Sequence, residues 1–300
     1  MKIVEASKRR SQLGEGPHWD ASTGTLIMDD ANGHEVLRYD PKTGTETEVF
    51  HLGDTVGNVI LYAGKPREAL VCVGMDIVHL DMDTRKTSVL TTVSPHTSEP
   101  PHRINDGKCD VKGRLWAGTM QRDWSLTSPQ GLGNFYSFSH GSLKKHLEDI
   151  TLSNGIAWTA DNKTMFYNDS VPGFTYAFDF DAEQGTISNR RVVVDFKKTS
   201  GFENCGLPDG MTIDVNDKLW LVGFSGSCVV QIDPETSQIL RKIDLPAKFT
   251  TSCCFGGPTY EDLYVTSAQF PDNPTRPEDG ALFKITELGA KGRAPYEFAG

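Results

Sequence analysis

Short apolar runs separated by turn residues alternate along the whole chain, and one arrangement of them recurs. An oxygen-bearing residue and a glycine precede a short apolar strand, a turn rich in Asp, Asn, Gly and Lys, and a second apolar strand. The arrangement starts at four dipeptides: Glu15-Gly16, Asp106-Gly107, Asn154-Gly155 and Asp209-Gly210. Self-similarity at a period of roughly 20–50 residues indicates a repeat architecture.

The spacing of this repeat predicts six units. The four glycines are separated by 91, 48 and 55 residues, so a further copy is expected to start near Val56, within the first gap. A sixth copy fits at Thr250. Each unit contains β-branched or aromatic runs bounded by Pro, Asp, Gly and Thr, which are the signals of β-hairpins.

Four short strands in each of six units are typical of an all-β, six-bladed β-propeller, and we predict that residues 1–300 form one such domain. No long stretch has an apolar period of 3.6 residues, so helices should be rare. A sandwich of six hairpins is the alternative fold, but it does not explain why one polar position recurs. Residues 124–133 and 269–280 interrupt the strands and are candidates to cover a site.

Composition and charge narrow the classes of function. A hydrophobic content of 37% and a charged content of 23% suit a chain that buries a large core. The net charge of −10 argues against a nucleic-acid partner, because phosphate binding needs clustered Lys and Arg. The chain has no long apolar run typical of a membrane span or signal peptide, so we expect a cytoplasmic protein without a membrane partner, and a monomer by default. The scattered cysteines are expected to be reduced.

The recurring polar residues are the main functional signal. In a propeller the innermost strand of each blade follows the central channel, so Glu15, Asp106, Asn154 and Asp209 are expected to converge at one mouth. Their roughly three negative charges repel one another unless a cation lies among them. All-oxygen ligation suits calcium, with magnesium or manganese as substitutes, and is less typical of zinc.

Simpler interpretations exist for each of these residues. Asp-Gly and Asn-Gly are common turn dipeptides, and only their recurrence at one register favours a shared site. Arg103 is equally well a salt-bridge partner or a clamp for a polar substrate. His18 and His102 flank the expected mouth, but a structural, hydrogen-bonded histidine is the favoured interpretation for each. The sequence has no P-loop, no dinucleotide fingerprint, no H-E-x-x-H and no G-x-S-x-G elbow.

At these residues the chain closely resembles the regucalcin (senescence marker protein) and gluconolactonase family, which includes the firefly luciferin-regenerating enzyme. The matching stretches occur in order along nearly the whole chain: Gly14-Glu15-Gly16-Pro17-His18-Trp19, Arg103-Ile104-Asn105-Asp106-Gly107-Lys108, Trp116-Ala117-Gly118-Thr119-Met120, Ser153-Asn154-Gly155, Pro208-Asp209-Gly210, Thr251-Ser252-Cys253-Cys254-Phe255-Gly256-Gly257 and Leu288-Gly289-Ala290-Lys291-Gly292.

The resemblance implies a six-bladed propeller with one catalytic divalent metal ion held by Glu15, Asn154 and Asp209. We expect Ca²⁺ first, with Zn²⁺, Mn²⁺ or Mg²⁺ as substitutes. Asp209 is implied to double as a general base. Asp106 is implied to lie beside the site rather than to ligate the metal, which narrows the four-residue set to three.

The resemblance also implies that Arg103 and Asn105 bind the polar groups of the substrate. Regucalcins carry a glutamate just after the Gly-Thr-Met run to contact sugar hydroxyls. In this chain Asp123 is the nearest match, and its side chain is shorter.

Together these residues predict a metal-dependent hydrolase of small cyclic esters, with a sugar lactone as the first expected substrate. Two alternatives remain open: a calcium-binding regulatory protein without turnover, and a luciferin-regenerating-type hydrolase of a non-sugar substrate. The loop 124–133 is a candidate lid over the site.

Overall fold

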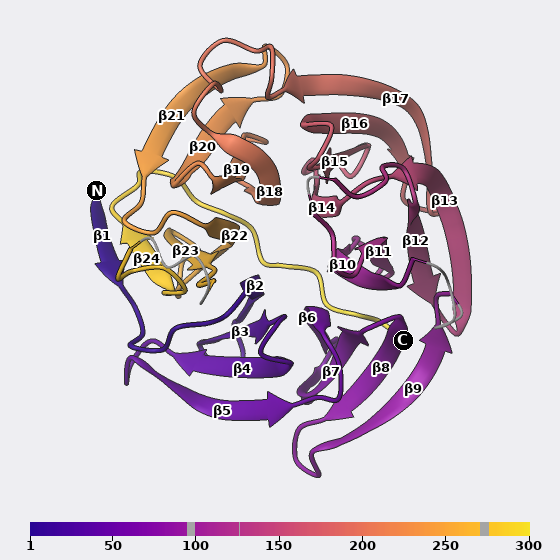
Figure 1. Cartoon of the computed structure of the whole chain (residues 1–300). Helices are drawn as coiled ribbons and strands as arrows, with labels where there is room; N and C mark the ends of the chain where they lie inside the picture. The colour runs from indigo at the N-terminus through magenta and orange to yellow at the C-terminus, as the bar shows by residue number, and fades with distance from the viewer. Residues whose placement is uncertain (95–99, 126, 271–275) are drawn as a thin grey trace.

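The chain is folded entirely from β-strands arranged around one axis (Figure 1). The computed structural model describes residues 1–94, 100–125, 127–270 and 276–300. Within these residues there are 24 strands, in six four-stranded sheets, and no helix. The prediction of an all-β, six-bladed propeller is therefore confirmed. That residues 1–300 make one domain stays a prediction.

The blades follow one another along the chain, and each is an antiparallel sheet. Blade 1 consists of β2 (Gly14–Asp20), β3 (Thr25–Asp30), β4 (Glu35–Asp40) and β5 (Thr45–His51). Blade 2 consists of β6 (Val56–Tyr62), β7 (Lys65–Val73), β8 (Asp76–Asp81) and β9 (Lys86–Thr92). Blade 3 consists of β10 (His102–Cys109), β11 (Leu115–Gln121), β12 (Gly133–Ser139) and β13 (Ser142–Ile150).

The second half of the chain repeats this order. Blade 4 consists of β14 (Ser153–Trp158), β15 (Thr164–Asp169), β16 (Phe174–Asp181) and β17 (Thr186–Asp195). Blade 5 consists of β18 (Gly206–Ile213), β19 (Leu219–Ser225), β20 (Cys228–Asp233) and β21 (Gln238–Asp244). Blade 6 consists of β22 (Thr250–Gly256), β23 (Asp262–Ser267), β24 (Phe283–Thr286) and the N-terminal β1 (Lys2–Glu5).

Two features close the ring. The first strand of every blade lies nearest the axis, and each of these inner strands contacts the inner strands of both neighbouring blades, with β22 returning to β2. The N-terminal strand completes blade 6, because Lys2 pairs with Thr286 and Glu5 with Phe283. The extra copies expected near Val56 and Thr250 are the inner strands β6 and β22. Each sheet therefore has one edge at the axis and one at the outside of the ring.

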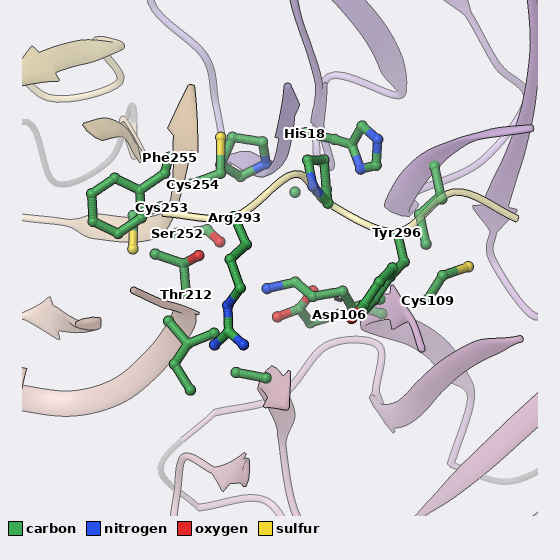
Figure 2. Close-up of a pocket in the computed structure, with 18 of the residues that line it drawn as sticks. His18, Asp106, Cys109, Thr212, Ser252, Cys253, Cys254, Phe255, Arg293 and Tyr296 are labelled. Atoms are coloured by element: carbon green, nitrogen blue, oxygen red, sulfur yellow. Dashed lines mark hydrogen bonds between the residues drawn. The ribbon is translucent and has the colours of Figure 1, made fainter. Parts of the chain in front are cut away.

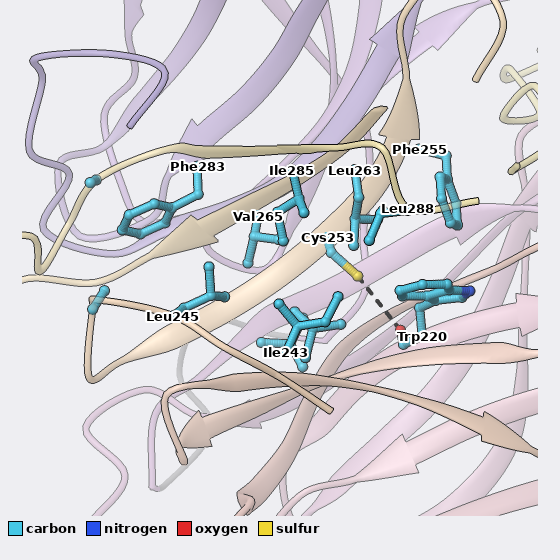
Figure 3. Close-up of a cluster of buried hydrophobic side chains, with 14 residues drawn as sticks. Trp220, Ile243, Leu245, Cys253, Phe255, Leu263, Val265, Phe283, Ile285 and Leu288 are labelled. Atoms are coloured by element: carbon cyan, nitrogen blue, oxygen red, sulfur yellow. Dashed lines mark hydrogen bonds between the residues drawn. The ribbon is translucent and has the colours of Figure 1, made fainter. Parts of the chain in front are cut away.

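The hydrophobic core lies between neighbouring blades and not on the axis. Figure 3 shows one such layer, in which Trp220 of blade 5 packs with Leu263, Val265 and Phe283 of blade 6. A second layer between blades 3 and 4 includes Trp116. Burying each large apolar side chain contributes about 1.5–3 kcal/mol. Polar side chains can therefore lie near the axis, where they are available to form a binding site.

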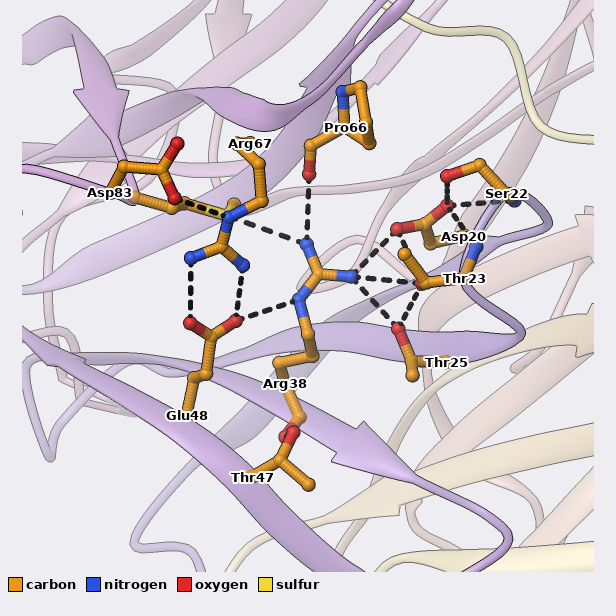
Figure 4. A network of polar contacts seen from close by, with 11 residues as sticks. Asp20, Ser22, Thr23, Thr25, Arg38, Thr47, Glu48, Pro66, Arg67 and Asp83 are labelled. Carbon is orange, nitrogen blue, oxygen red and sulfur yellow. Dashed lines mark hydrogen bonds and ion pairs between the residues drawn. The ribbon is translucent and has the colours of Figure 1, made fainter.

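Blades 1 and 2 are also joined by a network of charges (Figure 4). Arg38 is 4% exposed, and its guanidinium contacts Asp20 Oδ2 at 2.7 Å and Glu48 Oε2 at 3.2 Å. Arg67 of blade 2 makes a bidentate pair with Glu48 of blade 1, at 2.7 and 2.8 Å. These contacts lower the pKa of the Glu48 carboxyl, chiefly through the Arg67 hydrogen bonds. The network fixes the relative position of two blades that flank the channel.

The C-terminal segment 287–300 crosses one end of the channel (Figure 1). The Val215 N–H donates to the Lys291 carbonyl oxygen at 2.9 Å on one side, and the Phe298 N–H donates to the Leu61 carbonyl oxygen at 2.8 Å on the other. This end is therefore covered by the chain itself. Among the described residues, none belongs to a helix long and apolar enough to cross a bilayer.

Candidate active site

A pocket of about 600 Å³ lies at one mouth of the channel. Side chains from several blades line it, among them all six residues expected to form the site: Glu15, Arg103, Asn105, Asp123, Asn154 and Asp209. The fold thus brings together residues that are as far as 194 positions apart in the sequence. Pockets of this size suit small-molecule ligands.

Asp106 and His18 lie elsewhere. Both line a separate cavity of about 100 Å³, which Figure 2 shows beneath Arg293 and Tyr296 of the C-terminal segment. The expectation that Asp106 joins the other three polar residues at one mouth is therefore corrected. Burial lowers the pKa of His18 to about 4, so this histidine is neutral at physiological pH. Among the described residues its buried Nε2 has no hydrogen-bond partner, so the expected hydrogen bond is not found at this atom. His102 lines neither cavity.

The register of the inner strands explains the position of Asp106. In blades 1, 3, 4 and 5 a turn follows the inner strand, and it begins at Asp20, Asp110, Thr159 or Asp214, whose carbonyl oxygen accepts the turn hydrogen bond. Counting back five residues from each of these turns reaches Glu15, Asn105, Asn154 and Asp209.

Asp106 lies one position later than this set. Gly107 pairs with Ala117 as Met211 pairs with Leu221, so Asp106 is level with Gly210. The strands bulge at this point, and the residue at the bulge decides which side chain faces which cavity. Asn105 is the true counterpart of Asp209.

A glycine follows three of these residues because the inner strands approach one another closely near the axis. A Cβ atom on Gly155 would lie 2.7 Å from the Asp209 carbonyl oxygen, and one on Gly210 would overlap Ser252 Oγ. Gly16 additionally has a positive φ of 53°, a conformation that L-residues rarely adopt. The recurring Gly therefore records close packing around the axis.

Asn154 presents an unpartnered acceptor to the pocket. The side chain is 3% exposed, and its Nδ2 donates to Ser170 Oγ at 3.0 Å, which fixes the orientation of the amide. Asn154 Oδ1 is buried and has no hydrogen-bond partner among the residues that the structure describes. An unsatisfied buried carbonyl costs roughly 1–3 kcal/mol, so a ligand that bonds to this oxygen would be stabilised.

Two carboxylates complete the donor set. Burial, and then the nearby charge of Asp106, raises the pKa of Glu15 to about 8. Burial, and then the charges of Glu15 and Asp106, raises the pKa of Asp209 well above its ordinary value. Both groups are costly to ionise without a cation, and an oxygen-seeking divalent ion removes that cost.

The set of Glu15, Asn154 and Asp209 therefore fits a hard divalent cation. It consists of two carboxylates and one amide, all oxygen donors. No cluster of three His, Cys, Asp or Glu side chains in the described parts of the chain is arranged to hold a metal. Asn168 supports it, since its Nδ2 donates to the Asp209 carbonyl oxygen at 2.6 Å.

Arg103 and Asn105 lie beside this donor set on β10. Arg103 is 6% exposed, and in the described chain its guanidinium makes one hydrogen bond, to the Ile104 carbonyl oxygen at 3.3 Å, and no ion pair. Asn105 Nδ2 donates to the Ser153 carbonyl oxygen at 2.8 Å, which ties blade 3 to blade 4. A buried guanidinium with free N–H groups is a strong anchor for a polar substrate.

Asp123 lies at the exposed rim of the pocket, next to a fixed arginine. Arg122 makes a bidentate ion pair with Asp54, with Nη2 to Oδ2 at 2.7 Å. The Arg122 hydrogen bonds lower the pKa of Asp54 to about 2. The pair holds the segment that carries Asp123 and Trp124.

Position 126 of the candidate lid lies outside the described residues, as do positions 271–275 of the second interrupting segment.

One side of the pocket is apolar, and the sequence analysis missed it. Phe224, Phe249 and Phe270 line this side together with Leu13 and Leu207. The three aromatic residues come from separate strand ends in blades 5 and 6, so no local motif connects them. In the sequence, the one sign of this apolar side is a phenylalanine close to the end of a predicted strand.

The sequence of the chain matches the SMP-30/Gluconolactonase/LRE-like region over residues 13–269. The chain belongs to this family. Within the family, regucalcin of Xenopus laevis is 36% identical over 306 residues, covering 100% of this chain and 99% of the relative. Regucalcin of Homo sapiens is 37% identical over 309 residues, with the same coverage.

Solved structures of similar proteins agree with the propeller. A luciferin-regenerating enzyme superposes with a TM-score of 0.92 at 32% identity, covering 99% of both chains. A calcium-binding regucalcin from Agrobacterium tumefaciens superposes with a TM-score of 0.86 at 24% identity, covering 98% of this chain and 95% of the other. At that lower identity the second comparison shows the shared fold alone.

Proposed function

We propose that this family member is a divalent-metal-dependent hydrolase of small cyclic esters. The observation that carries the proposal is the buried Asn154 Oδ1, which lines one pocket with two carboxylates and the Arg103 guanidinium. Within the described residues, this oxygen has no hydrogen-bond partner and the guanidinium has no ion pair. The family relationship supports the reaction class, because gluconolactonases give the family part of its name. The expected sugar lactone is the first substrate to test.

In this proposal Glu15, Asn154 and Asp209 hold the ion, with Ca²⁺ expected first and Zn²⁺, Mn²⁺ or Mg²⁺ as substitutes. The ion supplies Lewis-acid stabilisation for the negative charge that develops on the lactone carbonyl oxygen. Arg103 and Asn105 bind the polar groups of the substrate and set its orientation. Asp123, at the rim, contacts the part of the substrate that projects toward solvent.

The Asp209 carboxylate then accepts a proton from the attacking water. The water oxygen bonds to the carbonyl carbon, the ring C–O bond breaks, and the released alkoxide takes up a proton to give an open-chain hydroxy acid. The segment at 124–133 is proposed to cover the pocket during this step. We propose that the protein works as a cytoplasmic monomer on a small-molecule substrate, with neither a nucleic-acid nor a membrane partner.

The test is hydrolysis of glucono-1,5-lactone by metal-stripped protein, followed by addition of Ca²⁺, Zn²⁺, Mn²⁺ or Mg²⁺ in turn. A divalent ion should restore turnover, and Asp209→Ala should abolish it. Asp149→Asn is the matched control, because this exposed carboxylate lines neither cavity. Retained activity in Asp209→Ala would rule out the general-base role.

Two other functions are distinguished by the same experiment. A calcium-binding protein without turnover uses the same three donors, and it would bind the ion but hydrolyse no lactone with any metal. A hydrolase of a non-sugar substrate is favoured by the 32% identity to a luciferin-regenerating enzyme. It would be metal-dependent but inactive on gluconolactone.

A further inference from the structure

The pocket has an apolar wall built from three phenylalanine rings in mutual contact. The rings of Phe249 and Phe270 lie edge to face with centroids 5.0 Å apart, and Phe224 lies 5.6 Å from Phe249 and 6.2 Å from Phe270. Separations of 4.5–7 Å are those of favourable aromatic pairs. The rings therefore support one another and form a fixed surface.

This wall belongs to blades 5 and 6, whereas Arg103 and Asn105 belong to blade 3. Phe224 is the penultimate residue of β19 in blade 5, Phe249 precedes β22 and Phe270 follows β23 in blade 6. Arg103 and Asn105 lie on β10 in blade 3, which Figure 1 shows across the ring from blade 6 and separated from blade 5 by blade 4. A ligand held by Arg103 and Asn105 would therefore have its other side toward the rings, with Asp209 of β18 beside Phe224.

Packing alone does not account for all of the wall. Phe249 is buried and fills space between the other two rings, as a core residue does. Phe224, Phe270, Leu13 and Leu207 are each only partly buried, and all of them line the pocket. Their apolar surface thus remains in contact with solvent in the free protein, and covering it would favour binding of an apolar group.

We propose that the substrate is a lactone whose ring carries an aromatic or alkyl group, and that this group lies against the phenylalanine wall. This rests on the proposed hydrolase function. The lactone carbonyl would face Glu15, Asn154 and Asp209, and the pocket of about 600 Å³ has room for a fused two-ring compound. A polyhydroxylated lactone would turn hydroxyl groups toward a wall that offers them no hydrogen bonds, which weakens its binding.

The test compares dihydrocoumarin, whose lactone ring is fused to benzene, with glucono-1,5-lactone, using Ca²⁺-loaded protein. We expect a higher kcat/KM for dihydrocoumarin. Phe224→Ala should lower that value by about 10–100-fold, since pocket contacts of this size discriminate by such factors, and should change the value for gluconolactone less than about threefold. Phe224→Leu, which keeps an apolar side chain, should retain most activity on dihydrocoumarin.

Phe174→Ala is the matched control, since Phe174 is also partly buried but lines neither the pocket nor the rear cavity. It should leave both substrates unaffected. Equal or better turnover of gluconolactone by the parent protein, or equal losses on both substrates in Phe224→Ala, would overturn the proposed substrate class.

A binding measurement separates this proposal from the proposed hydrolase function. Calorimetry measures the affinity of the protein for two lactams, dihydroquinolinone and gluconolactam. These have the same ring systems as the two lactones but are stable to hydrolysis, so binding is measured without turnover. Tighter binding of the aromatic lactam, weakened in Phe224→Ala, supports the proposal that the phenylalanine wall binds an apolar group. This holds even if neither lactone is hydrolysed, in which case only the hydrolase function is refuted. Tighter binding of gluconolactam contradicts the proposal that the phenylalanine wall selects an apolar substrate, whether or not hydrolysis occurs.

Discussion

Replacing Glu15 by Gln should stabilise the metal-free protein at alkaline pH. The pKa of this carboxyl is raised from its ordinary value of 4.5 to about 8, first by burial and then by the charge of Asp106. A group whose pKa is raised by folding contributes stability below its unfolded pKa and loses that contribution as pH rises through the folded value. The free energy of unfolding of the metal-free parent should therefore fall between pH 4.5 and about 8.

The size of this effect follows from the same shift. At 1.36 kcal/mol per pH unit, the full shift corresponds to about 5 kcal/mol. Glu15 is partly exposed to solvent, which screens its charge, so we expect a smaller loss of about 2–3 kcal/mol by pH 9. A neutral glutamine avoids this loss, and the variant should be more stable than the parent by that amount in the absence of metal.

The assay is urea unfolding of chelator-treated protein from pH 4 to pH 9. Parent and Glu15→Gln should have similar unfolding midpoints at pH 4 and diverge above pH 5. Adding Ca²⁺ should stabilise the parent but not the variant, because only the parent retains both carboxylates of the site. Glu235→Gln, at an exposed turn, controls for the loss of one negative charge. Equal stability of parent and Glu15→Gln at pH 9 would refute the reasoning.

Two further changes test the framework around the site. Gly210→Ala should lower the free energy of unfolding by about 1–3 kcal/mol, because the added Cβ overlaps Ser252 Oγ. The control Gly53→Ala places its Cβ in open space and should change this free energy by less than about 0.5 kcal/mol. Equal effects of the two variants in thermal unfolding would contradict the close approach of the inner strands. Asp54→Asn should raise KM for the lactone by roughly 3–10-fold with little change in kcat, because Arg122 loses its bidentate partner beside the pocket. Unchanged steady-state constants would show that this pair is only structural.

Much of the fold could be predicted from the sequence because each repeat meets the same packing requirements around the axis. Each inner strand needs small residues near the axis and a turn at its end, so Gly210 and Asp214 mark one blade as Gly155 and Thr159 mark another. The copies at Val56 and Thr250 lack the dipeptide of an oxygen-bearing residue and Gly, yet the regular spacing was enough to place them.

The candidate site was only partly predictable. Two oxygen-bearing residues, Asn105 and Asp106, precede Gly107, and the dipeptide pattern selected the wrong one as the counterpart of Asp209. Which of the two faces the pocket depends on the position of a bulge, and a bulge leaves no mark in the dipeptide itself. Counting back from the turn at Asp110 resolves the ambiguity.

The apolar wall was out of reach for a different reason. Its rings become neighbours only when blades 5 and 6 close beside each other, so their contact is a property of the ring. Local patterns predict strands and turns, and repeats predict which positions share the axis. Neither indicates which strand ends meet above one mouth of the channel.

The most direct test of the metal centre is anomalous diffraction from crystals of the protein soaked in Mn²⁺. Ligation by the three predicted donors requires one strong peak bonded to the Glu15 carboxylate, Asn154 Oδ1 and the Asp209 carboxylate, and no such peak in Asn154→Leu. A single peak near Asp106 in the rear cavity, or no bound ion in the pocket at saturating Mn²⁺, would contradict the central claim that these three residues hold the ion.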